Sequence, residues 1–217
     1  MNKKYEIVSL GTNCLPRTIL TRGEVKPSKS QGELSCPFDL VKHPIGSIIR
    51  CLKTDFEGYT DDLFFVARKR NILDFRKNGI WQKPDGTKFF HDKDCKIGDI
   101  DKLKTRITNR IGNFRQIIKS ETPILFVMYI IEDGEYVNEL YNELLRLCSH
   151  KKFKLAVLDF SEASVDYNKD ISVLKLTKPI HNFRQNWNKK GYRNSKLGRY
   201  VETNICKFVS DIIRDNF

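Results

Sequence analysis

The stretch that decides the fold is Pro-Ile-Leu-Phe-Val-Met-Tyr-Ile-Ile at residues 123–131. An unbroken apolar run of this length, directly after a proline, predicts a strand buried on both faces. Residues 137–148 follow with apolar positions at helical spacing, and Leu155–Phe160 is a second apolar run. A strand, a helix and a strand in this order predict a parallel pair joined by a right-handed crossover.

The same periodicities extend outward in both directions. Further strands are expected at residues 5–10 and 172–176, a hairpin at 79–91, and helices at 16–20, 44–52, 103–118 and 197–212. We therefore expect an α/β fold. The prediction is one domain over residues 1–217, with a mainly parallel sheet flanked by helices and an irregular insertion at about 24–100, after the first strand–helix unit.

Composition places the chain among globular proteins with a polyanionic partner. The 217 residues include 39 Lys and Arg against 27 Asp and Glu, which gives a net charge of +12. Such a surplus favours an anionic substrate or glycan; nucleic acid fits the charge but has no supporting motif. No apolar run approaches the roughly 18 residues of a membrane span, so none is expected.

The cysteines indicate a reducing compartment. Six cysteines are present and no pair forms C-x-x-C, so we expect free thiols and no structural zinc. Lys3 and Lys4 precede an apolar stretch of only Ile7–Leu10, which is too short for a secretion signal. These features predict a cytoplasmic protein.

Cofactor motifs are missing from the sequence. It contains neither a Walker loop nor a dinucleotide-binding glycine motif, so no cofactor is expected. Asp99-Ile100-Asp101 has the spacing of a glycosyltransferase metal site, but it opens a predicted helix, where acids favour the N-terminal dipole. We expect no metal site there.

The segment Ser-Leu-Gly-Thr-Asn-Cys at residues 9–14 is the strongest candidate for chemistry. It places Cys14 just past the carboxyl end of the first strand, where open α/β sheets bind ligands. A helix starting beyond Cys14 would lower the pKa of its thiol, and the Asn13 amide could donate to an oxyanion. The alternative is a cysteine that is simply packed in a strand-to-helix turn.

A thiol nucleophile needs a base, and His91 is the best of four histidines because it ends a hairpin arm beside Asp92. Its alternative is an exposed turn histidine. Asp92 or Asp39 could orient the imidazole, although Asp39 also suits the N-cap of the following helix. The remaining histidines, His43, His150 and His181, suit a loop, a helix end and the basic C-terminal segment.

Residues 171–201 hold eight basic residues and no acid, interleaved with aromatic and amide side chains. Cations beside aromatic rings suit phosphates or sugars. We expect this segment to form one wall of the active cleft and to bind substrate through five residues: Arg184, Trp187, Lys189, Lys190 and Arg193. The alternative is a solvated basic loop whose Trp187 packs on the domain.

Three motifs in order carry a resemblance. Ser-Leu-Gly-Thr-Asn-Cys, Pro-Phe-Asp at 37–39 and Phe-Phe-His-Asp at 89–92 resemble a bacterial and viral family of unknown function, labelled papain-like cysteine peptidases. The resemblance implies Cys14 as nucleophile and His91 as base, supported by Asp92 or Asp39. Leu40 replaces the tryptophan of the family pattern.

Two functions follow as expectations. The first is a cysteine-dependent hydrolase or acyltransferase acting on an anionic or glycan-linked substrate. The second is a non-catalytic polyanion-binding, glycan-binding or glycan-assembly protein that uses the basic C-terminal segment. A topological contrast favours acyl transfer over endopeptidase action: papain-like enzymes carry the cysteine on a long helix, whereas Cys14 follows a strand, as the serine does in flavodoxin-like esterases.

Overall fold

The computed structural model describes residues 4–67, 79–92, 94–162, 164–176, 187 and 189–217. The elements are β1 (Glu6–Leu10), α1 (Leu15–Arg22), η1 (Lys29–Gln31), α2 (Ile45–Lys53), β2 (Phe64–Ala67), β3 (Gly79–Gln82), β4 (Lys88–Phe89), α3 (Ile100–Lys119), β5 (Ile124–Ile130), η2 (Gly134–Tyr136), α4 (Val137–Leu147), β6 (Phe153–Asp159), β7 (Ile171–Lys175), α6 (Lys190–Arg193) and α7 (Lys196–Asn216).

The main sheet has the order β1-β5-β6-β7, and all three pairings are parallel. Leu10 pairs with Met128 in this register, so the carboxyl ends of β1 and β5 meet at one edge. The predicted strands therefore form in the predicted arrangement, and the α/β fold is confirmed. Segments joining these ends are the places where a parallel sheet offers a site.

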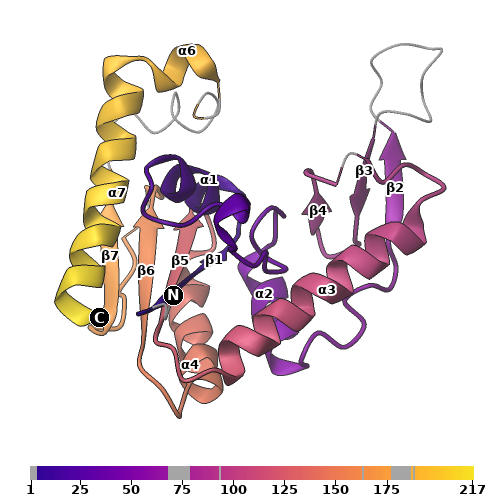
Figure 1. Ribbon diagram of the computed structural model, residues 1–217, viewed down its shortest axis with the longest axis horizontal. Helices are drawn as coiled ribbons and strands as arrows, with labels where there is room; N and C mark the ends of the chain where they lie inside the picture. Colours follow the sequence, from indigo (N-terminus) through magenta and orange to yellow (C-terminus); the bar gives the residue numbers. More distant parts are fainter. Residues whose placement is uncertain (1–3, 68–78, 93, 163, 177–186, 188) are drawn as a thin grey trace.

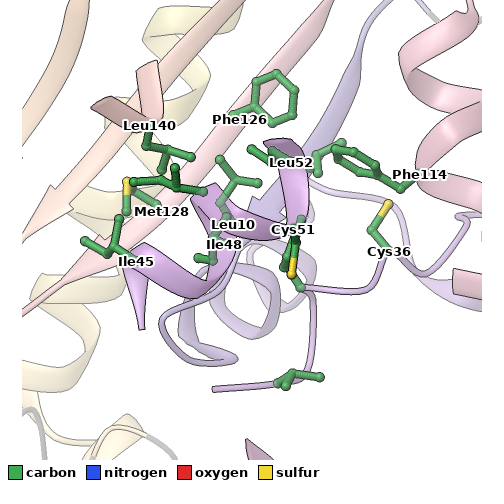
Figure 2. Close-up of a cluster of buried hydrophobic side chains, with 14 of the residues drawn as sticks. Leu10, Cys36, Ile45, Ile48, Cys51, Leu52, Phe114, Phe126, Met128 and Leu140 are labelled. Atoms are coloured by element: carbon green, nitrogen blue, oxygen red, sulfur yellow. The ribbon is translucent and has the colours of Figure 1, made fainter. Parts of the chain in front are cut away.

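Each face of the sheet has its own apolar core. Val8, Leu10 and Phe126 face α2, α3 and α4, whereas Ile7 and Leu125 face α1 and α7. Neighbouring strand residues alternate between the two cores because strand side chains point to opposite faces. Figure 2 shows the first core around Leu10, Ile48, Leu52 and Phe126. Every core residue predicted at the centre of the sheet is buried.

A second sheet, antiparallel and ordered β2-β3-β4, stands beside the first (Figure 1). The predicted hairpin corresponds to β3 and β4, and β2 adds the third strand. Helix α3 runs from beside this small sheet toward the main one, so it spans both (Figure 1). Its buried residues Leu103, Ile107, Ile111 and Phe114 repeat at the predicted helical spacing.

The part of the chain that the structure describes contains no helix long and apolar enough to cross a membrane.

Candidate active site

Cys14 lies where the sequence predicts it, in the turn between β1 and α1. It is the residue before the first turn of α1 and is half-buried. Thr12, two residues earlier, donates its hydroxyl to the carbonyl of Tyr129 near the end of β5. The turn is therefore fixed to the carboxyl edge of the sheet through β1 and β5 together.

Gly11 lies where two backbone segments come too close together to leave room for a side chain. A Cβ at this position would lie 2.2 Å from the carbonyl oxygen of Phe38 and 3.0 Å from that of Val41. Only a residue without a side chain lets the segment around Phe38 pass this close to the turn. The Gly11 carbonyl also accepts a hydrogen bond of 3.1 Å from the backbone N–H of His43.

The first turn of α1 offers few donors to an oxyanion. The Asn13 side-chain oxygen accepts the Leu15 N–H at 2.8 Å, and Pro16 has no N–H to give. The remaining donors include the Asn13 side-chain nitrogen, since only the oxygen of that amide is used in this bond.

The expected fall in the pKa of Cys14 is wrong. Burial raises the pKa of its thiol above the ordinary value, and a backbone hydrogen bond only partly offsets this. A thiol at this position stays protonated at neutral pH unless a base takes its proton. All six cysteines are free thiols, as predicted; Cys36, Cys51, Cys95 and Cys148 are buried, which leaves Cys14 and Cys206 half-buried.

Asp39 is a buried ion-pair residue, so its interpretation as a helix N-cap is wrong. Pro44 occupies the N-cap of α2. The Asp39 carboxylate accepts the Cys36 N–H at 2.6 Å and pairs with Arg17 on α1. Arg17 also pairs with Glu33 at 3.0 Å, and a further cation, Lys26, pairs with the same Glu33. This buried cluster carries two cations and two carboxylates, and it ties α1 to the Pro-Phe-Asp segment.

His91 lies in the exposed turn after β4, while the adjacent Asp92 side chain is fully buried. Two arginines of α3 hold the Asp92 carboxylate: Arg106 at 2.8 Å, and Arg110 through two bonds of 2.9 and 3.1 Å. Through these two arginines, Asp92 anchors the hairpin to α3, a role that the sequence did not predict.

The segment of residues 38–43 contacts the chain shortly before each candidate residue, at Gly11 and at Lys88. It meets Gly11 on one side, and Lys42 exchanges backbone hydrogen bonds of 3.0 and 2.9 Å with Lys88 of β4. Cys14 follows a strand of the parallel sheet and His91 follows a strand of the antiparallel sheet, whereas we expected both loops to come from one sheet edge. Cys14 also precedes α1, a helix of only eight residues.

The basic C-terminal segment is described in part. Arg184 lies outside the described residues, and so does Asn188. Trp187 packs against the core between α1 and α7, a core that also contains Leu15 next to Cys14. Lys189 is exposed, Lys190 begins α6, and Arg193 ends it half-buried. Figure 1 shows α6 at the same end of the sheet as the β6 and β7 arrowheads.

Other histidines and acids are placed as follows. His150 is exposed beyond α4, and His181 lies outside the described residues. His43 is buried against the rings of Phe38 and Tyr59, and burial lowers its pKa to about 3. Asp99 is the N-cap of α3 and Asp101 lies in its first turn, as predicted. Among the described residues, no three His, Cys, Asp or Glu side chains form a group that could hold a metal.

Among the residues that the structure describes, three cavities stand out, and neither Cys14 nor His91 is among the residues that line these three. One of about 870 Å³ lies between β1 and the 24–33 loop, above Lys26 and Glu33. One of about 260 Å³ lies beside Tyr59 and Lys83. The third, of about 390 Å³, lies at the carboxyl ends of β6 and β7.

The third cavity contains an acid that sequence reasoning missed. Asp159 ends β6 and is fully buried, with its carboxylate accepting from Ser161, Tyr167 and Lys175 at 2.7 to 2.9 Å. These bonds hold the pKa of Asp159 below its usual value even though burial opposes them. The sequence signal that could have identified Asp159 was its position at the end of an apolar run, residues 155–158.

The chain thus combines an α/β fold, a half-buried cysteine at a strand-to-helix turn and a histidine in the turn after an antiparallel hairpin. Residues 5–169 match the family described as "putative papain-like cysteine peptidase", and the chain belongs to that family. The match includes Cys14, Asp39, His91 and Asp92, and it ends before β7. Neither a curated protein nor a solved structure matches the chain.

Proposed function

We propose that this protein is a cysteine-dependent hydrolase or acyltransferase in which Cys14 is the nucleophile and His91 the base. One observation carries the proposal. Gly11, three residues before Cys14, and Lys88, three residues before His91, both contact the same segment, residues 38–43. The family match supports the same class of chemistry.

The chemistry begins with a neutral thiol, because burial raises the pKa of Cys14. An imidazole nitrogen of His91 takes the thiol proton as the sulfur bonds to the substrate carbonyl carbon. The carbonyl electron pair moves to oxygen, where the Asn13 side-chain nitrogen donates to it. When the carbonyl re-forms, the leaving group departs with the proton from His91 and the acyl group stays on sulfur. Water or another acceptor then takes the acyl group.

The direct test uses p-nitrophenyl acetate as an acyl donor. We expect nitrophenolate release together with acetylation of the peptide that contains Cys14. Cys14→Ala should remove both, while Cys206→Ala, which changes the other half-buried cysteine, should keep both. Acetylation that persists in Cys14→Ala, or that occurs on other residues, contradicts the proposal.

The role of His91 has its own test. His91→Ala should lower the rate of Cys14 acetylation roughly 10²-fold at neutral pH, which is the usual contribution of a general base. His150→Ala changes an exposed histidine elsewhere and should leave the rate unaltered. Equal rates in wild type and His91→Ala would remove His91 from the mechanism.

The second candidate function is polyanion or glycan binding by the basic C-terminal segment. The exposed side chains of Lys196, Arg199 and Tyr200 at the start of α7 favour it, because they add two cations and a ring beside α6. As a substrate wall or as a separate surface, the segment should bind polyphosphate with an affinity that falls steeply with salt.

A charge-reversal experiment tests this surface. Lys189→Glu combined with Lys190→Glu should weaken polyphosphate binding without unfolding the protein. Lys29→Glu combined with Lys96→Glu makes the same charge change on exposed lysines elsewhere and should weaken it much less. Salt-independent binding, or equal loss in both double variants, would contradict the assignment.

A further inference from the structure

One face of α3 carries a stripe of polar side chains that contact the turn of His91 and the loop that contains Ser35. Arg106, Arg110 and Asn113 are separated by four and three residues, so they lie on the same side of the helix. The two arginines bind Asp92, next to His91. Asn113 donates from its side-chain nitrogen to the carbonyl of Ser35 at 2.9 Å.

The contact of Asn113 continues to the helix that begins after Cys14. The Ser35 hydroxyl accepts from Arg17 at 3.5 Å, and Arg17 pairs with Asp39 and Glu33, on the same loop as Ser35. A line of side-chain contacts thus runs from the turn of His91, along α3, to the first turns of α1.

The contacts differ in burial along the stripe. The Asp92 side chain is 0% exposed and that of Arg110 is 11% exposed, while the more peripheral Asp94, which also pairs with Arg106, is 55% exposed. A buried, two-bond pair holds its geometry, whereas an exposed pair contributes little. Arg110 is therefore the main anchor of the His91 turn.

The adjoining face of α3 fixes the helix through apolar packing. Leu103, Ile107, Ile111 and Phe114 are part of the apolar core shared with the main sheet. Because these residues hold α3 in place, changes in the polar stripe alter what the helix positions more than they alter the helix itself.

We propose that Arg110 and Asn113 are positioning residues that set the approach of His91 to Cys14, with α3 as the common frame. This inference rests on the proposed function, since it concerns the same cysteine and histidine. Neither residue acts on the substrate. Misplacement of a base by about 1 Å can cost 10²-fold in rate, so loss of either anchor should be visible in the reaction of Cys14.

The test measures acetylation of Cys14 by p-nitrophenyl acetate as a function of pH. Arg110→Gln and Asn113→Ala should each lower the rate at least 10-fold at neutral pH and weaken the His91-dependent inflection. Arg115→Gln and Asn109→Ala are matched controls, because both residues are exposed on the same helix and contact neither loop; Arg115 pairs with Asp55. These controls should follow the wild-type profile.

Arg110→Lys separates position from charge. Lysine keeps the positive charge but loses the two-bond geometry, so the rate should stay well below wild type. If Arg110→Gln does not fold, Arg110→Lys and Asn113→Ala decide the question. Their urea unfolding midpoints show whether each variant is folded under the assay conditions.

The outcomes distinguish this inference from the proposed function. If wild-type acetylation does not depend on His91, the proposed function fails first. If it does depend on His91, but Arg110→Lys and Asn113→Ala match their controls, the positioning role of α3 is wrong and the proposed function stands.

Discussion

The main parallel sheet and the region between the two sheets are built in different ways. The sheet has fully buried strands, with each residue of β5 less than 2% exposed and none of them charged. The inter-sheet junction, which we define as residues 11–17, 33–43 and 88–92 with the polar face of α3, buries Arg17, Glu33, Asp39 and Asp92. The candidate site lies in the second region.

The difference has an energetic meaning. Apolar burial is non-directional and tolerates small shifts, whereas buried ion pairs stabilise only in good geometry and are costly when one partner is lost. The sheet thus supplies stability, and the junction fixes the orientation of the two loops. The predictions below separate these contributions.

The largest effect should come from the sheet. Phe126→Ala leaves a cavity between β5 and α2 and should lower the free energy of unfolding by about 3–5 kcal/mol. At a temperature where the variant is folded, its pH profile of Cys14 acetylation should match wild type. Urea unfolding and the acetylation assay check both parts, and an altered profile would mean that the two regions are not separable.

Arg17→Met should affect both the stability of the fold and the reaction of Cys14. It removes the ion pair of Asp39 with Arg17 and leaves Glu33 paired with Lys26, so the free energy of unfolding should fall by about 3 kcal/mol. Cys14 acetylation should also slow, since α1 loses its link to the loop. Arg22→Met is the control, because Arg22 pairs with Glu202 at a more exposed position of the same helix. Equal stability losses in the two variants would contradict the buried-pair account.

Gly11→Ala tests the close approach of two backbones. The new Cβ would displace the Phe38 carbonyl, and such overpacking costs about 1–3 kcal/mol. Gly46→Ala is a suitable control, because a Cβ there meets nothing within 4 Å. The urea midpoint should fall for Gly11→Ala alone; an unchanged midpoint would show that the turn has room for a side chain.

His43 gives the junction a dependence on pH. Its pKa is lowered from 6.5 to about 3 by burial, so between these values the unfolded chain binds a proton that the folded chain does not. Stability should therefore fall as the pH drops below 6.5, by about 2 kcal/mol between pH 7 and 5. His43→Gln should lose this component, while His150→Gln should retain it. A wild type with the same pH dependence as His43→Gln would contradict this.

The smallest effect should come from an exposed ion pair. Lys53 on α2 pairs with Glu139 on α4 at 2.7 Å, and both side chains are 48% exposed. Lys53→Ala should leave the free energy of unfolding almost unchanged, because solvent screens such pairs. A larger loss would show that surface charges hold the two helices together.

The sequence predicted well the strands and helices that have long apolar patterns. Runs such as residues 124–131 and the spacing of Leu103, Ile107 and Ile111 report burial directly, because burial of these side chains is what forms the elements. The position of Cys14 at a strand end followed from the same patterns.

The ion pairs of the inter-sheet junction could not be predicted in this way. No local pattern in the sequence identifies Arg17, 22 residues earlier, as the partner of Asp39, or Arg110 as the partner of Asp92. The same holds for the pKa of Cys14: the start of the helix could be predicted from the sequence, but the burial that raises the pKa depends on tertiary packing, which local patterns do not report.

The most direct test of the central claim is cross-linking of Cys14 to His91 by dibromoacetone, a short reagent that alkylates a thiol and then an imidazole within reach. The account predicts a covalent link between the peptides that contain Cys14 and His91, identified by mass spectrometry. This link should be absent in His91→Ala and strongly reduced in Arg110→Lys. Single alkylation of Cys14 without a link to His91, in folded wild-type protein, would contradict the pairing of these two residues.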